Sequence, residues 1–344
     1  MIPITIVYAI LIFVVLIFVH ELGHFLAAKA CGVQVNEFAI GLGPAILKKQ
    51  WGETTYAIRA LPFGGQCVME GEDDDSPNPR AFNRAAKWKR FLILIAGVTM
   101  NFLMGLVIFL CLYAPIEERA VPVVDELMEK FTGGGEHGIQ EGDRILSVDG
   151  YRILFTTDIS MAFARSDDYD FDIVVRRDSE RIKLHDVHIE PQEYLENGES
   201  VMYYGFRYEV RQLSFFGKIH LALLESISMV RMVFESLSMI FSGNVTLNDM
   251  AGPVGITAAM STVAQQSMSS FWYMAGLIAI NLAVMNALPI PALDGGRIFF
   301  LLIEAITRRK LNWKAEAILN GAVLILLLGF MLVVTANDIW RLIK

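Results

Sequence analysis

The stretch His20-Glu21-Leu22-Gly23-His24 follows directly on Ile2–Val19, a segment that contains no charged residue. A segment of this length and apolarity is long enough to cross the hydrocarbon core of a bilayer. In an α-helix a step of four residues brings His20 and His24 to one face, one turn apart. Ionisable side chains at the end of a membrane helix are costly and are expected to be functional. The stretch therefore predicts a helical membrane protein whose first span carries a functional site.

The rest of the chain agrees with a polytopic membrane protein. Hydrophobic residues make up 54% of its 344 residues and charged residues only 19%, which is more apolar than a typical soluble domain. Three further segments are long and apolar, namely Phe91–Ala114, Phe271–Ile303, which Asp294 and Arg297 interrupt, and Ile318–Ala336. We therefore expect about four spans, and the three cysteines imply no disulfide framework.

Between the first two spans the sequence predicts a small membrane-associated β-sheet. Its alternating segments are Val35–Ile40, Thr54–Arg59 and Gln66–Met69, with glycines 41, 43, 64 and 65 marking turns. A sheet at membrane depth must be shielded by protein or water, because lipid cannot satisfy the hydrogen bonds of its edge.

Residues 115–212 are predicted to form an inserted, mostly β domain. Its expected strands are 121–124, 144–148, 171–175, 181–188 and 203–208, with a short helix over 157–165. The segment Gly138–Gly150 resembles the best-marked part of PDZ domains, where an aliphatic residue, a Gly-Asp turn and a strand precede an Asx-Gly hairpin. Such domains bind peptide tails by strand addition, so a bound tail is an expected partner.

The chain is thus divided into four parts. Residues 1–114 form the N-terminal membrane part, 115–212 the PDZ domain, 213–270 an amphipathic helix with a loop, and 271–344 the C-terminal spans. The polar stripe of the helix over 213–241 favours a place along the membrane interface over a groove beside the spans.

Charge is unevenly distributed along the chain, whose net charge is −8. Acidic residues outnumber basic ones about two to one between Pro115 and Leu213, whereas basic residues gather at Arg84–Arg90 and Arg308–Lys310. Basic flanks stay in the cytoplasm, which puts the N-terminus and the PDZ domain outside and the functional site toward the cytoplasmic side. The acidic balance of the soluble part gives nucleic-acid binding no support.

Two imidazoles on one helix face can hold Zn²⁺, and Glu21, about 100° around the helix, can take a proton from the attacking water. A catalytic zinc usually has three protein ligands. Asp294 is the acidic residue within the third span, and Pro289 and Pro291 break the helix just before it. An ion pair between Asp294 and Arg297 is the alternative.

Asn281 and Asn286 are further polar residues on the third span. They are expected either to hydrogen-bond a substrate backbone or the developing oxyanion, or to pack between helices. A further histidine pair, His185 and His188, lies three apart on a predicted strand, so its side chains are expected on opposite faces and not at a second metal site.

The box at 20–24 and the Asn-x-x-Pro-x-Pro-x-Leu-Asp-Gly pattern at 286–295 resemble the site-2 protease family, closest to its bacterial RseP-type branch. Segments 38–44, 61–65, 97–101 and 251–255 are similar to further motifs of that family, so the likeness covers nearly the whole chain. Gln66 departs from the pattern, since an aromatic residue often stands there, and only one PDZ domain fits.

The resemblance implies one Zn²⁺ per chain, held by His20, His24 and Asp294, with Glu21 as the catalytic base. It implies regulated intramembrane proteolysis of single-span proteins, such as anti-sigma factors or signal-peptide remnants, in the bacterial inner membrane. The β-region would hold an unwound substrate, which makes residues Gly43, Gly64, Gly65 and Gln66 candidates for substrate binding.

Three competing functions remain at this point. The first is a membrane scaffold with an inert metal site, which the presence of Glu21 disfavours. The second is a different membrane metalloprotease with a downstream glutamate such as Glu304 as its third ligand. The third is an ion or metal transporter, which a single carboxylate and the lack of repeated halves make a poor fit.

Overall fold

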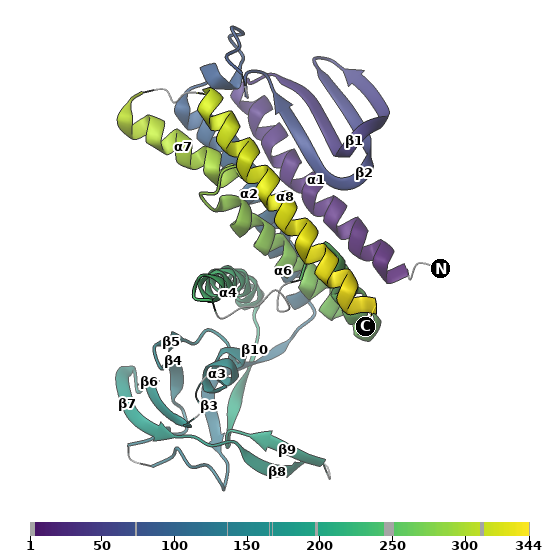
Figure 1. Ribbon diagram of the computed structural model, residues 1–344. Helices are drawn as coiled ribbons and strands as arrows, with labels where there is room; N and C mark the ends of the chain where they lie inside the picture. The colour runs from purple at the N-terminus through teal and green to yellow at the C-terminus, as the bar shows by residue number, and fades with distance from the viewer. Residues whose placement is uncertain are drawn as a thin grey trace. The chain divides into compact units, whose positions relative to one another are not determined.

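The computed structural model describes residues 4–72, 74–135, 137–164, 166, 168–196, 199–243, 251–309 and 313–343. The chain divides into two compact units (Figure 1). The membrane unit comprises Met1–Tyr113 and Glu225–Lys344, and the β unit comprises Ala114–Leu224. Two predictions include residues that are not described. The predicted helix over 157–165 ends at Arg165, and the predicted basic flank 308–310 ends at Lys310.

The described residues contain four helices that are long and apolar enough to cross a membrane. They are α1 (Ile4–Cys31), α2 (Lys87–Tyr113), α6 (Met268–Ala287) and α8 (Trp313–Ile343). They agree with the predicted polytopic membrane protein of about four spans. A short 3-10 helix, η1 (Phe82–Arg84), precedes α2.

The first helix is longer than predicted, because α1 continues through the histidine box as far as Cys31. The box therefore lies inside the helix and not at its end. Nothing between His20 and Cys31 breaks the helix, and Gly32 then adopts a left-handed conformation with φ 78°. This is the usual position of a terminating glycine, which satisfies the last carbonyl groups without a side-chain clash.

Helix α2 packs against both α1 and α6 through glycines. A Cβ on Gly23 of α1 would lie 2.5 Å from the carbonyl oxygen of Ala96, and one on Gly105 of α2 would lie 2.7 Å from Ile280 Cδ1. Small residues let helix backbones approach closely where lipid supplies no hydrophobic drive between helices. The close approach of α1 and α2 sets the width of the site described below.

The segment predicted as one interrupted span, Phe271–Ile303, consists of two helices. After α6 ends at Ala287, the chain turns through two prolines and begins α7 (Asp294–Thr307) at Asp294 itself. Glycines 295 and 296 allow the tight turn, since added Cβ atoms would lie 2.1 Å from Leu288 O and 2.3 Å from Ile290 O. The turn thus places Asp294 at the first position of a new helix.

The region between α1 and α2 is a two-stranded antiparallel hairpin of β1 (Val35–Trp51) and β2 (Thr54–Met69). The prediction of three short strands was wrong. Gly41, Gly43 and Gly64 lie within the strands at φ 87°, 85° and 83°, beside irregularities of the register. These glycines therefore form bulges rather than turns, because a positive φ lets a strand bend without ending it.

The β unit holds a six-stranded sheet in the order β10-β3-β4-β6-β7, with β5 paired to β4, and a separate β8-β9 hairpin. The strands are β3 (Glu118–Leu127), β4 (Arg144–Val148), β5 (Tyr151–Arg152), β6 (Asp170–Arg177), β7 (Glu180–His188), β8 (Gln192–Glu196), β9 (Glu199–Tyr203) and β10 (Phe206–Gln212). Helix α3 (Thr156–Phe163) packs on one face through a core that includes Ile159, Phe163, Ile145 and Val175.

The prediction of a single strand over 203–208 was wrong. That stretch contains the end of β9 and the start of β10, because Gly205 turns the chain between them at φ 85°.

Two further helices lie between β10 and α6 in the chain. Helix α4 (Phe215–Phe241) begins in the β unit and ends in the membrane unit. Helix α5 (Pro253–Gln266) lies where the sequence predicted only a loop. Pro253 begins α5, and the amide of Gly255 in its first turn donates to Asp338 Oδ2 of α8 at 2.8 Å. A partner 83 residues away along the chain thus stabilises the start of α5. Local sequence patterns do not reveal such a partner.

Candidate metal centre

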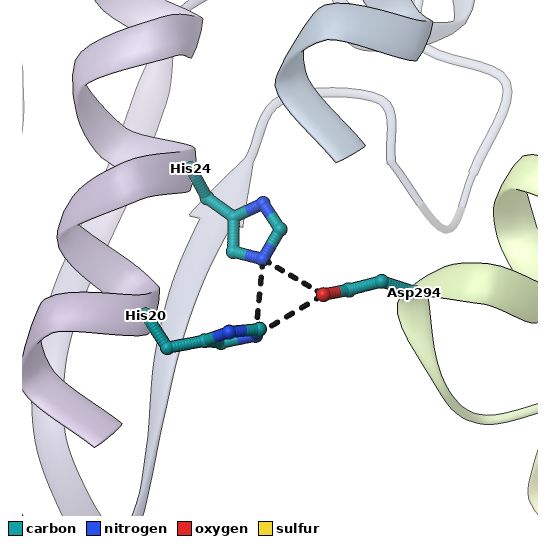
Figure 2. A group of neighbouring side chains, drawn as sticks. All are labelled: His20, His24 and Asp294. Carbon is teal, nitrogen blue, oxygen red and sulfur yellow. Dashed lines mark hydrogen bonds and ion pairs between the residues drawn. The ribbon is translucent and has the colours of Figure 1, made fainter. Parts of the chain in front are cut away.

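Three side chains from two distant parts of the chain meet in the membrane unit (Figure 2). His20 and His24 extend from α1, and Asp294 extends from the start of α7. Asp294 Oδ2 lies 3.1 Å from His20 Nε2 and 3.2 Å from His24 Nε2, and the two Nε2 atoms lie 3.3 Å apart. These three atoms therefore form a nearly equilateral triangle.

The orientation of His24 is fixed by the backbone of α2. Its Nδ1 lies 2.8 Å from the carbonyl oxygen of Ile93, and the residue is only 6% exposed. Because a carbonyl can only accept, Nδ1 carries the proton and Nε2 is left with a free lone pair. Second-shell hydrogen bonds of this kind orient a ligating imidazole and fix its tautomer.

His20 has a comparable partner in Asn101, an α2 residue that is only 1% exposed. The side-chain nitrogen of Asn101 lies 3.4 Å from His20 Nδ1, while its Oδ1 is buried without a hydrogen-bond partner. With the amide turned by 180°, Oδ1 accepts the proton of Nδ1, which satisfies both groups and leaves the Nε2 lone pair free. The structure thus suits both imidazoles to bind through Nε2.

Gly97 of α2 provides the space for the two rings. A Cβ at this position would lie 2.3 Å from His24 Nε2 and 2.8 Å from His20 Cε1. Any larger residue would therefore displace the imidazoles from their present positions. The sequence analysis noted segment 97–101 as similar to a family motif but assigned no role to Gly97 or Asn101. A polar asparagine within a charge-free span was the available signal for the latter.

The triangle has the dimensions that a zinc ion requires. Ligand atoms at about 2.0 Å from a tetrahedral Zn²⁺ lie about 3.3 Å from one another. The observed separations of 3.1–3.3 Å match this edge length, and two neutral imidazoles with one carboxylate are a usual catalytic donor set. In the described part of the chain no other group of three His, Cys, Asp or Glu side chains is placed to hold a metal.

The geometry supports neither an Asp294–Arg297 ion pair nor Glu304 as the third ligand. Arg297 forms an ion pair with Glu72 of the loop after β2, so it does not neutralise Asp294 by a helix-turn pair. Glu304 lies 2.9 Å from Arg90 Nη1 through Oε2, and is absent from the group of possible metal ligands. Asp294 is therefore the carboxylate that the fold brings to the two histidines.

Glu21 lies between the metal centre and the hairpin. A Cβ on Gly65 of β2 would lie 2.8 Å from Glu21 Cγ and 3.0 Å from Ile17 Cγ2, so only glycine fits here without a shift. The remaining sequence-predicted residues are distributed along the same elements: Gly43 in β1, Gly64 and Gln66 in β2, and Asn281 and Asn286 in α6. Asn281 also lines an apolar cavity of about 1060 Å³.

The second histidine pair has separate partners. His185 Nδ1 lies 3.1 Å from Asp172 and His188 Nδ1 lies 2.7 Å from Asp170. The prediction that the two side chains occupy opposite faces was wrong, because Asp186 between them adopts φ 51° and both histidines are exposed. The irregular backbone shifts the alternation by one residue.

The H-E-x-x-H pattern lies on a helix of membrane-spanning character, and the third ligand atom comes from α7, which begins after a proline-containing turn. This combination defines a membrane metallopeptidase. The model of Peptidase family M50 matches residues 8–330, and the chain belongs to this family of site-2 proteases. It is a zinc metalloprotease.

Three relatives illustrate the likeness. A protein of Fusobacterium nucleatum whose name describes it as a zinc metalloprotease is 35% identical over 98% of this chain and 99% of its own. A similarly named protein of Clostridium perfringens is 36% identical over 97% and 98%. The regulator of sigma-W protease RasP of Bacillus subtilis is 29% identical over 98% and 99%.

Proposed function

We propose that this protease cuts single-span membrane proteins within or beside their membrane segments. The triangle of His20 Nε2, His24 Nε2 and Asp294 Oδ2, with edges of 3.1–3.3 Å, carries the proposal. The first two atoms belong to a helix of membrane-spanning character, so the substrate bond must reach the same depth as that helix. A substrate that already lies in the bilayer meets this condition.

In this proposal His20, His24 and Asp294 hold one Zn²⁺, and Glu21 is the proton carrier. The ion supplies a Lewis acid for the scissile carbonyl and lowers the pKa of the attacking water. The Glu21 carboxylate takes a proton from that water and then donates it to the nitrogen of the leaving amine. The hydrogen bonds that His24 Nδ1 donates to the Ile93 carbonyl and His20 Nδ1 donates to Asn101 keep both imidazoles in the orientation that this arrangement needs.

The substrate segment unwinds and pairs as an extended strand with the hairpin, because a helical backbone hides the carbonyl to be attacked. The contact of Glu21 Cγ with Gly65 supports this placement, since a strand beside β2 would pass close to the base. Gly43, Gly64 and Gln66 would line the same path. Asn281 and Asn286 would donate hydrogen bonds to substrate carbonyls.

The remaining assignments follow the same proposal. Residues 1–114, 115–212, 213–270 and 271–344 act as the four parts that the sequence indicates, and the second is a PDZ domain that binds peptide tails. This domain and the N-terminus face outward, and the metal centre lies toward the cytoplasm. The name of RasP, a regulator of sigma-W protease, supports an anti-sigma factor as substrate, with a signal-peptide remnant as the other choice.

The test compares the wild-type chain with Glu21→Gln, both purified in detergent. The variant is expected to retain one zinc per chain and to lose cleavage of a single-span model substrate. Cleavage at the wild-type rate by the variant would reject the role of Glu21. In cells, the single-span fragments that stay uncut and accumulate with Glu21→Gln would identify the substrates. If no such fragment accumulates, the proposed substrate class is wrong.

A further inference from the structure

The β unit contains a cavity of about 900 Å³ whose lining includes five basic side chains. Its walls come from β4, β5, β6, β7 and the first turns of α4, all within the unit. The basic residues are Arg144, Arg152, Arg176, Arg181 and Lys183, and among the described lining residues Asp172 is the one that is acidic. This is unexpected in a domain where acidic residues outnumber basic ones about two to one.

Three of these arginines form a row across the sheet. Arg144 of β4 is directly opposite Arg176 of β6, which is directly opposite Arg181 of β7. All three are exposed, while neighbours such as Ile145 and Val175 point into the core on the other face. Like charges directly opposite each other destabilise a sheet, so the row weakens the fold unless an anion offsets it.

The side chains of the row have no partner among the residues that the structure describes. Within the described residues, no ion pair or hydrogen bond joins the side chains of Arg144, Arg176, Arg181 or Lys183 to another group. By contrast, Arg177, the next residue along β6, forms a 2.7 Å ion pair with Asp143. Guanidinium groups fit phosphate oxygens in a bidentate manner, so the row is suited to a phosphate-bearing ligand.

Helix α4, which supplies one wall of the cavity, contacts the residue that follows α2 in the chain. Lys218 Nζ of α4 donates to the carbonyl oxygen of Ala114 at 2.5 Å, and Ala114 directly follows Tyr113, the last residue of α2. Phe215 and Phe216, at the start of α4, are 72% and 79% exposed. Exposed phenylalanine rings on an amphipathic helix suit the membrane–water interface.

The α4 wall of the cavity lies close to this point. It consists of His220 and Leu224, and His220 is two residues beyond Lys218, about 3 Å along the helix. The attraction of basic side chains to a membrane surface acts over about one Debye length, ~8 Å at physiological ionic strength. The α4 wall therefore begins within this distance of Ala114, the residue that follows the α2 span.

We propose that this cavity binds the headgroup of an anionic phospholipid, with the phosphate on the row formed by Arg144, Arg176 and Arg181. The apolar part of the lining, which includes Leu146, Val174 and Leu224, suits the glycerol and the first acyl carbons. Without this contact the acidic β unit would be repelled by an anionic bilayer, so the bound lipid would also orient the unit on the membrane. An acidic peptide shares the charge of the lipid but not its apolar part.

The test titrates the purified full-length chain, in neutral detergent, with short-chain phosphatidylglycerol and, separately, short-chain phosphatidylcholine. Native mass spectrometry measures the bound fraction. We expect wild type to prefer phosphatidylglycerol. The variant Arg176→Gln/Arg181→Gln should bind it about 25-fold more weakly, since each basic side chain near an anionic surface contributes about fivefold.

The matched control is Arg207→Gln/Arg211→Gln. It removes the same charge from β10, where both arginines are already paired with glutamates at 3.5 Å and 2.7 Å, so its lipid affinity should equal that of wild type. Equal weakening in both double variants would reduce the effect to net charge and reject the cavity. A hexaglutamate peptide that binds wild type while phosphatidylglycerol does not would also overturn the proposal.

Discussion

Replacement of Gly97 by alanine tests whether the width of the gap between α1 and α2 sets the metal centre. The new Cβ would lie 2.3 Å from His24 Nε2, whereas ordinary van der Waals contact begins at 3.4 Å. The imidazole or the helix must therefore move by about 1 Å, and metal–ligand distances tolerate only about 0.2 Å. We expect zinc affinity to fall 10- to 100-fold, as for other changes around ligands, and cleavage to fall about 100-fold.

The helix propensity of alanine distinguishes a displacement of the imidazoles from a general loss of stability. Alanine is a better helix former than glycine by about 1 kcal/mol, so the substitution favours α2 itself. Gly321→Ala in α8 is the matched control, because its added Cβ meets nothing within 4 Å. Zinc affinity is measured by competition with a chromophoric chelator, cleavage with a single-span substrate, and folding by circular dichroism. Wild-type zinc affinity and cleavage in a folded Gly97→Ala variant would refute the reasoning.

Two further predictions concern the third ligand and the hairpin. Asp294→Ala should lose zinc while Glu304→Ala retains it, because only Asp294 reaches the histidines; equal zinc content by elemental analysis would contradict this. Hydrogen bonds from Arg80 and Lys29 lower the pKa of Glu53 to about 2. The stabilising contribution of Glu53 is therefore present above its ordinary pKa of 4.5 and is lost as the pH falls through about 2. Hydrogen exchange at the β1–β2 turn should increase over this range in wild type but not in Glu53→Gln.

Much of the membrane part could be predicted from sequence because its signals are local. The charge-free segments indicated four helices, and the prolines before Asp294 indicated the break that separates α6 from α7. Boundaries were less accurate where the decisive signal was a single residue. Gly32 ends α1 well beyond the predicted end of the span, and Gly41 and Gly43 bend β1 without ending it.

Other features could not be predicted because their partners are distant in sequence. The start of α5 is stabilised by Asp338 of α8, and Arg297 pairs with Glu72. The row of arginines in the β unit depends on strand register, which only the paired sheet reveals. Neighbours along the chain gave no sign that three like charges would lie side by side.

By itself, the sequence determined that His20 and His24 share one helix face, since the α-helical period places residues four apart together. It also determined that the backbone is interrupted before Asp294, because proline cannot continue a helix. Only the tertiary structure decided that these elements meet, with Oδ2 of Asp294 at 3.1 and 3.2 Å from the two imidazoles. That meeting depends on the glycine contacts between α1 and α2 and on the tight turn into α7, which are properties of packing and not of local periodicity.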